Sequence, residues 1–351
     1  MKRYIGLDVH ATSCTAAIID GRGKHVGRHV IETNGQALVE FLKLQPGRLH
    51  LCLEEVTQSA WLTEILAPHV EELVVTVPRR SRGSKNDALD AFGLAEQLRR
   101  GAIDTKVFKH QGPYGTLRQL VKVHRAVVDD RRRTQSRLKA LFRSRGVPTP
   151  GKDVYAVGSR ARWLAVLPES SRSSAEVLYE QYDALSRVRN QAKKELVRES
   201  HRFPITRTLE TCPGLGEVRV ARFVSVVVSP HRFRGRRQLW SYCGLGVVMR
   251  SSSDWEQAPD GSWQKVLRPT TRGLNRNFNR MLKDVFKGAA TTVLQQGGEE
   301  PLYVEYLRHL DGGTKPNLAK VTLARKIAST ALSMWKNEEE YAPEKRTIRS
   351  S

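Results

Sequence analysis

The first third of the chain passes from the hydrophobic period of strands to that of helices. Short apolar runs within 3–9, 12–20 and 24–31 predict three β-strands, the last two joined by a glycine-rich turn. The pattern then predicts alternating elements, namely helix 34–45, strand 49–54, helix 59–69, strand 72–77 and helix 86–100. Three antiparallel strands followed by alternating helix and strand predict a mixed α/β sheet.

Two longer helices are predicted next, at 113–146 and 173–202. Apolar residues of the second recur at alternating spacings of four and three, with Arg189 interrupting, and they are Leu178, Tyr182, Leu185, Ala192 and Leu196. This rhythm is typical of a coiled-coil arm for self-association, and it fits equally a helix that packs on its own domain.

The remainder of the chain is predicted to be mainly α-helical. The helices expected are 217–228, a helix that opens at Thr271-Arg272-Gly273, and 317–336. The turn Pro213-Gly214-Leu215-Gly216 either aims backbone N–H groups at a phosphate or is an ordinary tight turn. The predicted domains are 1–112, 113–204 and 205–340, followed by a polar tail at 341–351.

Charge narrows the class of partner. Lys and Arg total 59 against 36 Asp and Glu, which gives a formal charge of +23. A surplus spread along the whole chain indicates nucleic-acid binding, while a basic membrane-surface protein or a ribosomal protein are the other classes with such a balance. The residues expected to contact nucleic acid are Lys85, Arg234, Arg236, Arg237, Arg272, Arg276 and Arg280.

The four cysteines indicate neither zinc nor disulfides. Cys14, Cys52, Cys212 and Cys243 form no Cys-x-x-Cys pair, and no histidine follows at zinc spacing. The chain enters a strand almost at once and holds no apolar stretch long enough to span a bilayer. We therefore expect a reducing cytoplasm, no signal peptide and no membrane partner.

Four carboxylates in the first quarter of the chain are the candidate chemistry. Asp8 closes the first strand, Glu55 follows the fourth, and Asp87 and Asp90 begin the next helix at a spacing that shares one face. Each alone is more simply a solvated strand end or a helix N-terminal acid, and Glu54 competes with Glu55 for the fourth strand. Clustered carboxylates repel one another unless cations separate them, and oxygen ligands favour Mg²⁺ or Mn²⁺. The set predicts metal-assisted phosphodiester chemistry.

A series of motifs then appears in a recognisable order. They are Tyr4-Ile5-Gly6-Leu7-Asp8, Glu55-Val56-Thr57 with Trp61, Lys85-Asn86-Asp87-Ala88-Leu89-Asp90, Pro213-Gly214-Leu215-Gly216, Gly244-Leu245, Thr271-Arg272-Gly273 and Ala324-Arg325-Lys326. Together they resemble the DEDD-type transposases and site-specific recombinases of bacterial insertion sequences, which include related DNA invertases. The resemblance covers residues from about 3 to 336 and selects Glu55 over Glu54.

The resemblance implies more than the composition does. It implies an α/β RNase H-like (RuvC-like) domain that holds Mg²⁺ or Mn²⁺ through Asp8, Glu55, Asp87 and Asp90, a long helical connector and a mainly α-helical transposase domain with a nucleophilic serine. The strand and helix order predicted above is also the one expected of a ribonuclease-H-like domain. The implied partners are donor and target double-stranded DNA, a structured noncoding bridge RNA and further copies of the chain, as a dimer or tetramer. The implied location is the bacterial cytoplasm, at the nucleoid.

The family pattern places the serine eight residues after the glycine of Gly244-Leu245, which gives Ser252. The glycine that normally follows is replaced by Ser253, and the expected proline after Gly-Leu is absent, so Ser251 and Ser253 stay open. Without the resemblance, a flexible serine-rich loop is the simpler interpretation. We expect an RNA-guided DNA recombinase with a covalent phosphoserine intermediate; the alternatives are a hydrolytic RuvC-like nuclease and a non-catalytic RNA-binding protein.

Overall fold

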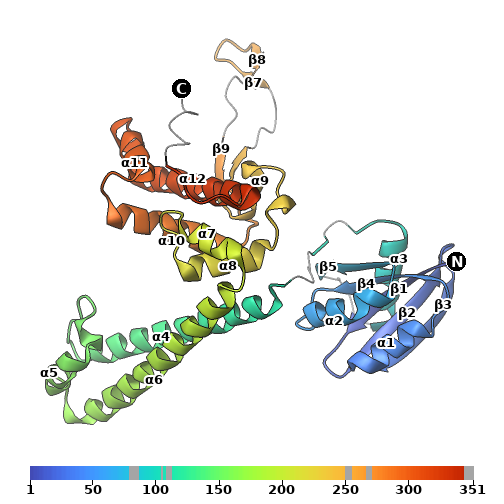
Figure 1. Cartoon of the computed structure of the whole chain (residues 1–351), viewed down its shortest axis with the longest axis horizontal. Helices are drawn as coiled ribbons and strands as arrows, with labels where there is room; N and C mark the ends of the chain where they lie inside the picture. Colours follow the sequence, from blue (N-terminus) through green and yellow to red (C-terminus); the bar gives the residue numbers. More distant parts are fainter. Residues whose placement is uncertain (79–86, 104–105, 108–112, 250–254, 266–270, 344–351) are drawn as a thin grey trace. The chain divides into compact units, whose positions relative to one another are not determined.

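The computed structural model describes residues 1–78, 87–103, 106–107, 113–249, 255–265 and 271–343 (Figure 1), without the side chains of residues 87, 88, 249, 256, 265, 271 and 272. Contacts within the chain divide it into two units, Met1–Gly112 and Pro113–Ser351. Each unit contains hydrophobic core clusters of its own. The finer division into three domains and a tail stays a prediction.

Unit 1 is a five-stranded sheet with helices on both faces (Figure 1). Its strands are β1 (Lys2–Val9), β2 (Ser13–Asp20), β3 (His25–Glu32), β4 (Arg48–Glu54) and β5 (Glu72–Thr76). Its helices are α1 (Gly35–Lys43), α2 (Ser59–Leu66), the 3₁₀ turn η1 (Ala67–His69) and α3 (Asp87–Arg99). The order is β3-β2-β1-β4-β5, with β2 antiparallel and β4 parallel to the central β1. The predicted mixed α/β sheet is confirmed.

The two faces of the sheet follow from the alternation in β1. Ile5 and Leu7 are buried in the cluster that includes the apolar side chains of α1 and α2. Gly6 points the other way, toward α3, where a Cβ atom would lie 1.9 Å from the carbonyl oxygen of Ala91. Because no other residue has room there, Gly6 lets α3 lie directly on the centre of the sheet.

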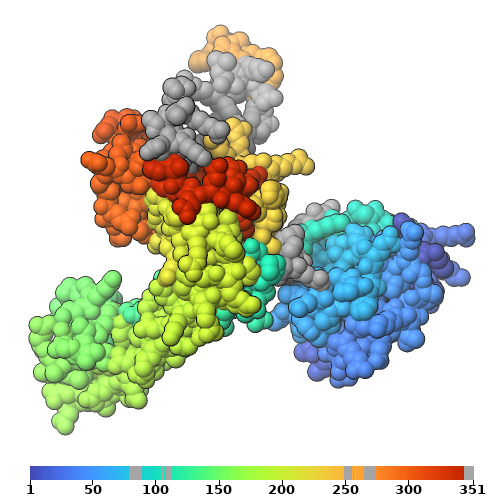
Figure 2. Space-filling model, viewed as in Figure 1, coloured from blue at the N-terminus to red at the C-terminus, as the bar shows by residue number. Residues whose placement is uncertain are grey.

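Unit 2 begins with a helical hairpin. Its long helices, α4 (Gly115–Arg143) and α6 (Glu169–Ser200), pack against each other, and the space-filling view shows them in contact along the arm (Figure 2). Between them lie η2 (Asp153–Tyr155), η3 (Val157–Ser159) and α5 (Arg160–Ala165).

Some of the regularly spaced apolar residues in the helix predicted at 173–202 pack within the chain. Arg131 of α4 donates hydrogen bonds to Tyr182 and Ser186 of α6, and its guanidinium stacks over the Tyr182 ring. Leu178 lies against the small core at the tip of the arm, and Leu196 is buried in the large core at its base. The structure therefore favours packing within the chain for these positions, and self-association through the arm stays a proposal.

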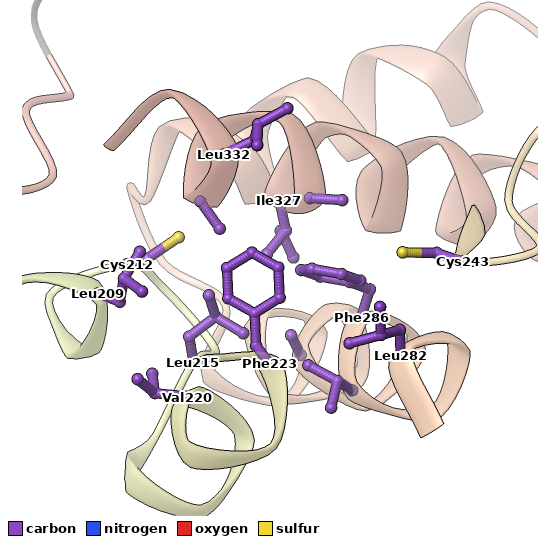
Figure 3. Packing of buried hydrophobic residues seen from close by; sticks show 14 of the residues in the cluster. Leu209, Cys212, Leu215, Val220, Phe223, Cys243, Leu282, Phe286, Ile327 and Leu332 are labelled. Carbon is purple, nitrogen blue, oxygen red and sulfur yellow. The ribbon is translucent and has the colours of Figure 1, made fainter. Parts of the chain in front are cut away.

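The rest of unit 2 is a helical bundle. Its helices are α7 (Pro204–Glu210), α8 (Glu217–Val227), η4 (Pro230–Arg232), α9 (Arg236–Tyr242), α10 (Arg280–Gln296), α11 (Pro301–Asp311) and α12 (Pro316–Asn337). At its centre Phe223 meets Phe286 and Trp335 edge to face, each with ring centroids 5.3 Å apart, and Figure 3 shows the apolar side chains around Phe223 and Phe286. Leu117 and Val121 of α4 belong to the same core, which joins the arm to the bundle.

The turn Pro213-Gly214-Leu215-Gly216 connects α7 to α8 and has a packing role. Gly214 has φ 78°, and a Cβ there would lie 2.4 Å from the backbone oxygen of Ala289 in α10. Its own carbonyl accepts a hydrogen bond from Arg219. These contacts support the ordinary-turn interpretation, because the glycine is explained by close approach of two backbones.

One predicted helix start is wrong. Residues Thr271–Leu274 form strand β9, which pairs antiparallel with β6 (Val247–Met249). Asn275 then accepts a hydrogen bond from the backbone N–H of Asn277, and Asn279 caps α10 by accepting from Leu282. Asparagine side chains compete with the helix for backbone groups, so the helix starts only at Arg280 and does not carry Arg276.

Candidate functional site

The first candidate site is the edge of the sheet in unit 1 where β1 and β4 end. Asp8 is the second-last residue of β1, and its carboxylate Oδ2 lies 3.2 Å from Nε2 of His10. Asp8 is paired with Thr15 on β2, and by the alternation of β1 it shares a face with Gly6. Asp8 therefore lies on the face of the sheet that α3 covers.

The N-terminus of α3 lies at the same edge. Gly6 meets Ala91, and the last helical residue, Arg99, reaches the hairpin turn at Gly21 near the opposite end of the sheet. The helix consequently runs antiparallel to β1, which brings its first turn, with Asp87 and Asp90, toward the end that carries Asp8. Asp90 is exposed, and the side chain of Asp87 lies outside the described part of the chain.

Two adjacent residues, Glu54 and Glu55, are candidates for the glutamate of the acidic set. The parallel pairing of β1 with β4 ends at Leu7 and Leu53, so the next residue, Glu54, comes beside Asp8. Cys52, two residues earlier, packs in the cluster of α3, which puts Glu54 on that same face. Glu55 follows the strand and is exposed, while its backbone N–H donates to the carbonyl of Thr76. The pleat thus favours Glu54, and the motif spacing favours Glu55.

The donor chemistry at this edge fits a hard cation. Asp8, Glu54, Glu55 and Asp90 are carboxylates, and Mg²⁺ and Mn²⁺ prefer oxygen ligands. Among the residues whose side chains the structure describes, no three His, Cys, Asp or Glu side chains are grouped closely enough to hold a metal ion. That set does not include Asp87, the acid at the very start of α3.

The second candidate site is the loop Gly244-Leu245-Gly246 in unit 2. Gly244 has φ 66°, and a Cβ there would lie 2.4 Å from the ring of Phe278. Gly246 lies so close to Ser241 of α9 that a Cβ would be 3.0 Å from its Cα. Both glycines are therefore explained by close approach, which brings this loop against the segment that follows β9.

A half-buried arginine holds the loop from the other side. Nε of Arg325, in the middle of α12, donates to the carbonyl of Leu245 at 2.6 Å. In return, Nε1 of Trp240 donates to the carbonyl of Arg325 and to Oγ of Ser329 at 2.9 and 3.0 Å. Burial lowers the pKa of the Arg325 guanidinium from its ordinary value. The motifs Gly244-Leu245 and Ala324-Arg325-Lys326, far apart in sequence, are parts of one assembly.

Asn275 completes this assembly. Its backbone N–H donates to the carbonyl of Gly246 at 2.9 Å, and its side-chain amide donates to Ser241 and to the carbonyl of Asn277. With the β6–β9 ladder, these bonds fix both ends of the stretch between 249 and 271. We call the loop 244–246, Asn275 and Arg325 the serine platform, because the chain leaves β6 directly into 250–254. Ser252, with Ser251 and Ser253, lies outside the described residues.

Five of the arginines predicted to contact nucleic acid are close in sequence to the residues of the serine platform. Arg234, Arg236, Arg237, Arg276 and Arg280 are exposed. Arg236 and Arg237 begin α9, and Arg280 begins α10, so they occur at the starts of the two helices joined through Asn275 and the backbone bond from Asn279 to Tyr242. Lys85 and the side chain of Arg272 lie outside the described part. The exposed arginines are suited to phosphate contacts.

Sequence reasoning missed the supporting residues. The sequence motifs included Arg325 but gave it no role, and they did not include Asn275 or Phe278. The available signal was the run Asn275-Arg276-Asn277-Phe278-Asn279, because alternate asparagines are typical of turns and helix caps.

Two transposase family models match this chain. A DEDD transposase model of the IS110 type matches residues 5–145, and a model described as transposase IS116/IS110/IS902 family matches residues 206–300. The chain belongs to the DEDD-type transposases of insertion sequences. A search of curated proteins gives no match.

Each of the two matches contains one of the two candidate sites of the transposase. The first contains all four acids, and the second contains Ser252 and Asn275 but ends before Arg325. Membership in the family implies that the protein binds DNA and cleaves and rejoins it. Within the described residues of the transposase, no helix has the length and apolar character needed to cross a membrane.

Proposed function

We propose that this transposase exchanges DNA strands through a covalent bond between DNA and Ser252, assisted by the acidic edge of unit 1. The observation that carries the proposal is the serine platform. Three stretches distant in sequence, 240–246, 275–279 and 325–329, meet there and hold the chain before and after the segment that contains Ser252. A catalytic hydroxyl must be held within a fraction of an ångström of its reacting position, and fixed anchors on both sides of its segment support such a role.

Unit 1 supports an assisting role. We infer that its sheet is an RNase H-like, RuvC-like domain, because the order β3-β2-β1-β4-β5 with a central β1 is the arrangement expected of that fold. Asp8, Glu55, Asp87 and Asp90 are the acids that we assign to a divalent cation, Mg²⁺ or Mn²⁺. When bound, such an ion would stabilise negative charge on the oxygens of the reacting phosphate.

The chemistry at the serine is a transesterification. Oγ of Ser252 forms a bond to phosphorus, one ester bond between that phosphorus and a deoxyribose oxygen breaks, and the departing oxygen takes up a proton while the serine hydroxyl gives one up. The number of phosphoester bonds is unchanged, so a second strand end can later displace the serine without an external energy source. The exposed arginines of α9 and α10 would hold the phosphates on either side.

The guide RNA and the oligomer belong to the same proposal. A formal charge of +23 suits polyanionic partners, and a structured bridge RNA is a partner that the family resemblance implies. We propose that a dimer or tetramer brings the acids of one copy and the serine of another to one phosphate. RNA that co-purifies with the transposase, sequenced and compared with the DNA flanking its gene, tests the guide.

The test of the central claim is a denaturing gel. Transposase incubated with labelled DNA substrate should give a protein–DNA adduct that survives denaturation, and peptide mapping should locate the link at Ser252. Ser252→Ala should bind nucleic acid normally and form no adduct, whereas Ser251→Ala and Ser253→Ala should keep at least part of the activity. A link mapped to either neighbour would show that the register is wrong. Cleavage without any adduct would favour the hydrolytic nuclease.

A further inference from the structure

The segment between the platform's two ends contains a β-hairpin whose exposed surface is aromatic. Strands β7 (Trp255–Gln257) and β8 (Trp263–Lys265) pair antiparallel (Figure 1), with Trp255 opposite Lys265 and Gln257 opposite Trp263. Residues opposite one another, and residues two apart, share a face of a ladder. Trp255 and Trp263 therefore lie on one face, and their exposed fractions are 53% and 65%.

The turn of this hairpin is built to hold its shape. The N–H of Gly261, which has φ 84°, donates to the carbonyl of Ala258, and the N–H of Ala258 donates to the carbonyl of Ser262. Asp260 accepts hydrogen bonds from the hydroxyl and the backbone N–H of Ser262, which lower the pKa of its carboxyl. Pro259 fixes its own φ. The two tryptophans are thus presented by an ordered turn.

The β7–β8 hairpin exposes apolar surface that it cannot bury by itself. A two-stranded hairpin alone is marginally stable in water, and indole rings are among the most costly groups to leave in contact with it. Apart from half-buried Ala258, every hairpin residue whose side chain is described is exposed. A ligand with flat apolar faces would gain from covering the tryptophan face.

The chain's geometry identifies which ligand lies within reach. Trp255 follows Ser252 by three residues, so their Cα atoms are at most about 11 Å apart whatever the conformation between them. DNA rises about 3.4 Å per base pair, so that reach spans about three base steps from a phosphate bonded to Ser252. Basic residues also flank the hairpin in sequence, with Arg250 before it and Arg268 after it.

We propose that Trp255 and Trp263 stack on unpaired bases of the DNA strand beside the cleaved phosphate. Strand exchange requires base pairs next to the cut to open, and opening exposes base faces that stack well on indole rings. The hairpin would hold those bases until the strand is rejoined to its new partner. This inference rests on the proposed function, since it uses Ser252 as the position of the cut.

The experiment uses the full-length transposase and a single-stranded DNA oligonucleotide that contains 2-aminopurine, whose fluorescence is quenched by stacking. The same sequence as a duplex and as single-stranded RNA provides the comparison, all at one salt concentration. The double variant Trp255→Ala/Trp263→Ala should bind single-stranded DNA about a hundredfold more weakly, roughly tenfold for each ring, and lose the quenching. Trp255→Phe/Trp263→Phe should largely restore both, because phenylalanine also stacks. Trp61→Ala, which removes a tryptophan 38% exposed in α2, should change neither.

Each other outcome overturns the proposal. An equal loss for duplex DNA would make the hairpin a general backbone contact, and an equal or larger loss for RNA would assign it to the RNA. An unchanged affinity would leave the tryptophans without a role in binding bases. A double variant that changes its oligomeric state in light scattering, with binding intact, would make the face an interface between copies. Quenching measured with Ser252→Ala separates this inference from the proposed function, because it needs no covalent adduct.

Discussion

The acidic edge of unit 1 and the serine platform of unit 2 are built in opposite ways. The acidic edge comes from regular elements, since the pleat of β1 and the direction of α3 put their acids at one end of the sheet. The serine platform comes from irregular backbone held by side chains that reach 80 to 89 residues along the sequence. Regular elements tolerate local changes, whereas the platform depends on a few individual contacts.

Neutralising an acid should have the largest effect on activity. Asp8→Asn should reduce DNA cleavage by roughly a thousandfold or more, because it removes a charged oxygen from the predicted metal site and changes the size of the side chain little. Asp20→Asn, at the far end of the same sheet, is the matched control, since the amide oxygen can still accept the turn hydrogen bonds from Arg22 and Lys24. Cleavage of labelled DNA in Mg²⁺ measures both, and near-normal cleavage by Asp8→Asn would remove Asp8 from the site.

The same assay decides between the two glutamates of β4. We expect Glu55→Gln to lose cleavage to a similar extent and Glu54→Gln to keep at least a tenth of it, as the motif spacing predicts. The reverse result would mean that the pleat, which puts Glu54 on the face of Asp8, determines the ligand.

A methyl group at the tight turn of unit 2 should have the largest effect on stability. Gly214→Ala should lower the free energy of unfolding by about 3 kcal/mol, because it strains a positive φ and forces a Cβ against the backbone of α10. Gly216→Ala is the control, since φ there is −81° and no atom lies within 4 Å of the added Cβ. Denaturant unfolding measures the difference. Equal effects from the two substitutions would mean that close approach to α10 does not explain Gly214.

Replacing Arg325 of the serine platform should reduce stability less than Gly214→Ala does, and it should reduce activity more. Arg325→Met should destabilise the chain by about 2 kcal/mol, because the carbonyl of Leu245 loses a hydrogen bond from a charged donor. Adduct formation should fall more than the loss of folded protein accounts for, since the loop before Ser252 is released. Lys326→Met removes only a surface ion pair with Glu305 and should cost under about 1 kcal/mol. Adduct formation that stays normal in folded Arg325→Met would separate the platform from the chemistry.

The smallest expected effect is on the pH dependence of stability, and it comes from a buried histidine. The surroundings of the buried histidines differ between the two units. In unit 1, His50 lies 3.3 Å from a Glu72 oxygen, whereas both ring nitrogens of His124 in α4 have no hydrogen-bond partner among the described residues. Burial, reinforced by Arg222, lowers the pKa of His124 to about 4. The unfolded chain binds this proton near the ordinary pKa of about 6.5, so stability falls as the pH drops from about 6.5 toward 4.

The expected loss from this histidine is at most about 2 kcal/mol between pH 7 and pH 5. Denaturant unfolding at both pH values should show that His124→Leu reduces the pH dependence by up to that amount. His231→Leu, which replaces an exposed histidine of the same unit, is the control. A pH dependence that is the same in His124→Leu and the unaltered chain would contradict the lowered pKa.

The sequence by itself determined the architecture of unit 1. Strand alternation and helix period depend on neighbours a few residues away, so β1 to β5, α1 and α3 were predicted close to their observed bounds. The order of elements and the positions of Asp8, Asp87 and Asp90 at their ends predicted a shared edge, which the direction of α3 agrees with. The strand pattern left the choice between Glu54 and Glu55 open, because it depends on where pairing stops, and only the motif spacing with Thr57 and Trp61 selected Glu55.

Only the tertiary structure decided the serine platform. The pattern predicted a helix at Thr271, but pairing with β6 makes it a strand, and the side chains of Asn275 and Asn279 delay α10 to Arg280. Neither the contact of Arg325 with Leu245 nor the approach of Phe278 to Gly244 leaves a local pattern, since each joins elements distant in the chain. Local propensity is readable from a few neighbouring residues, whereas a site built from long-range contacts exists only once the chain has folded.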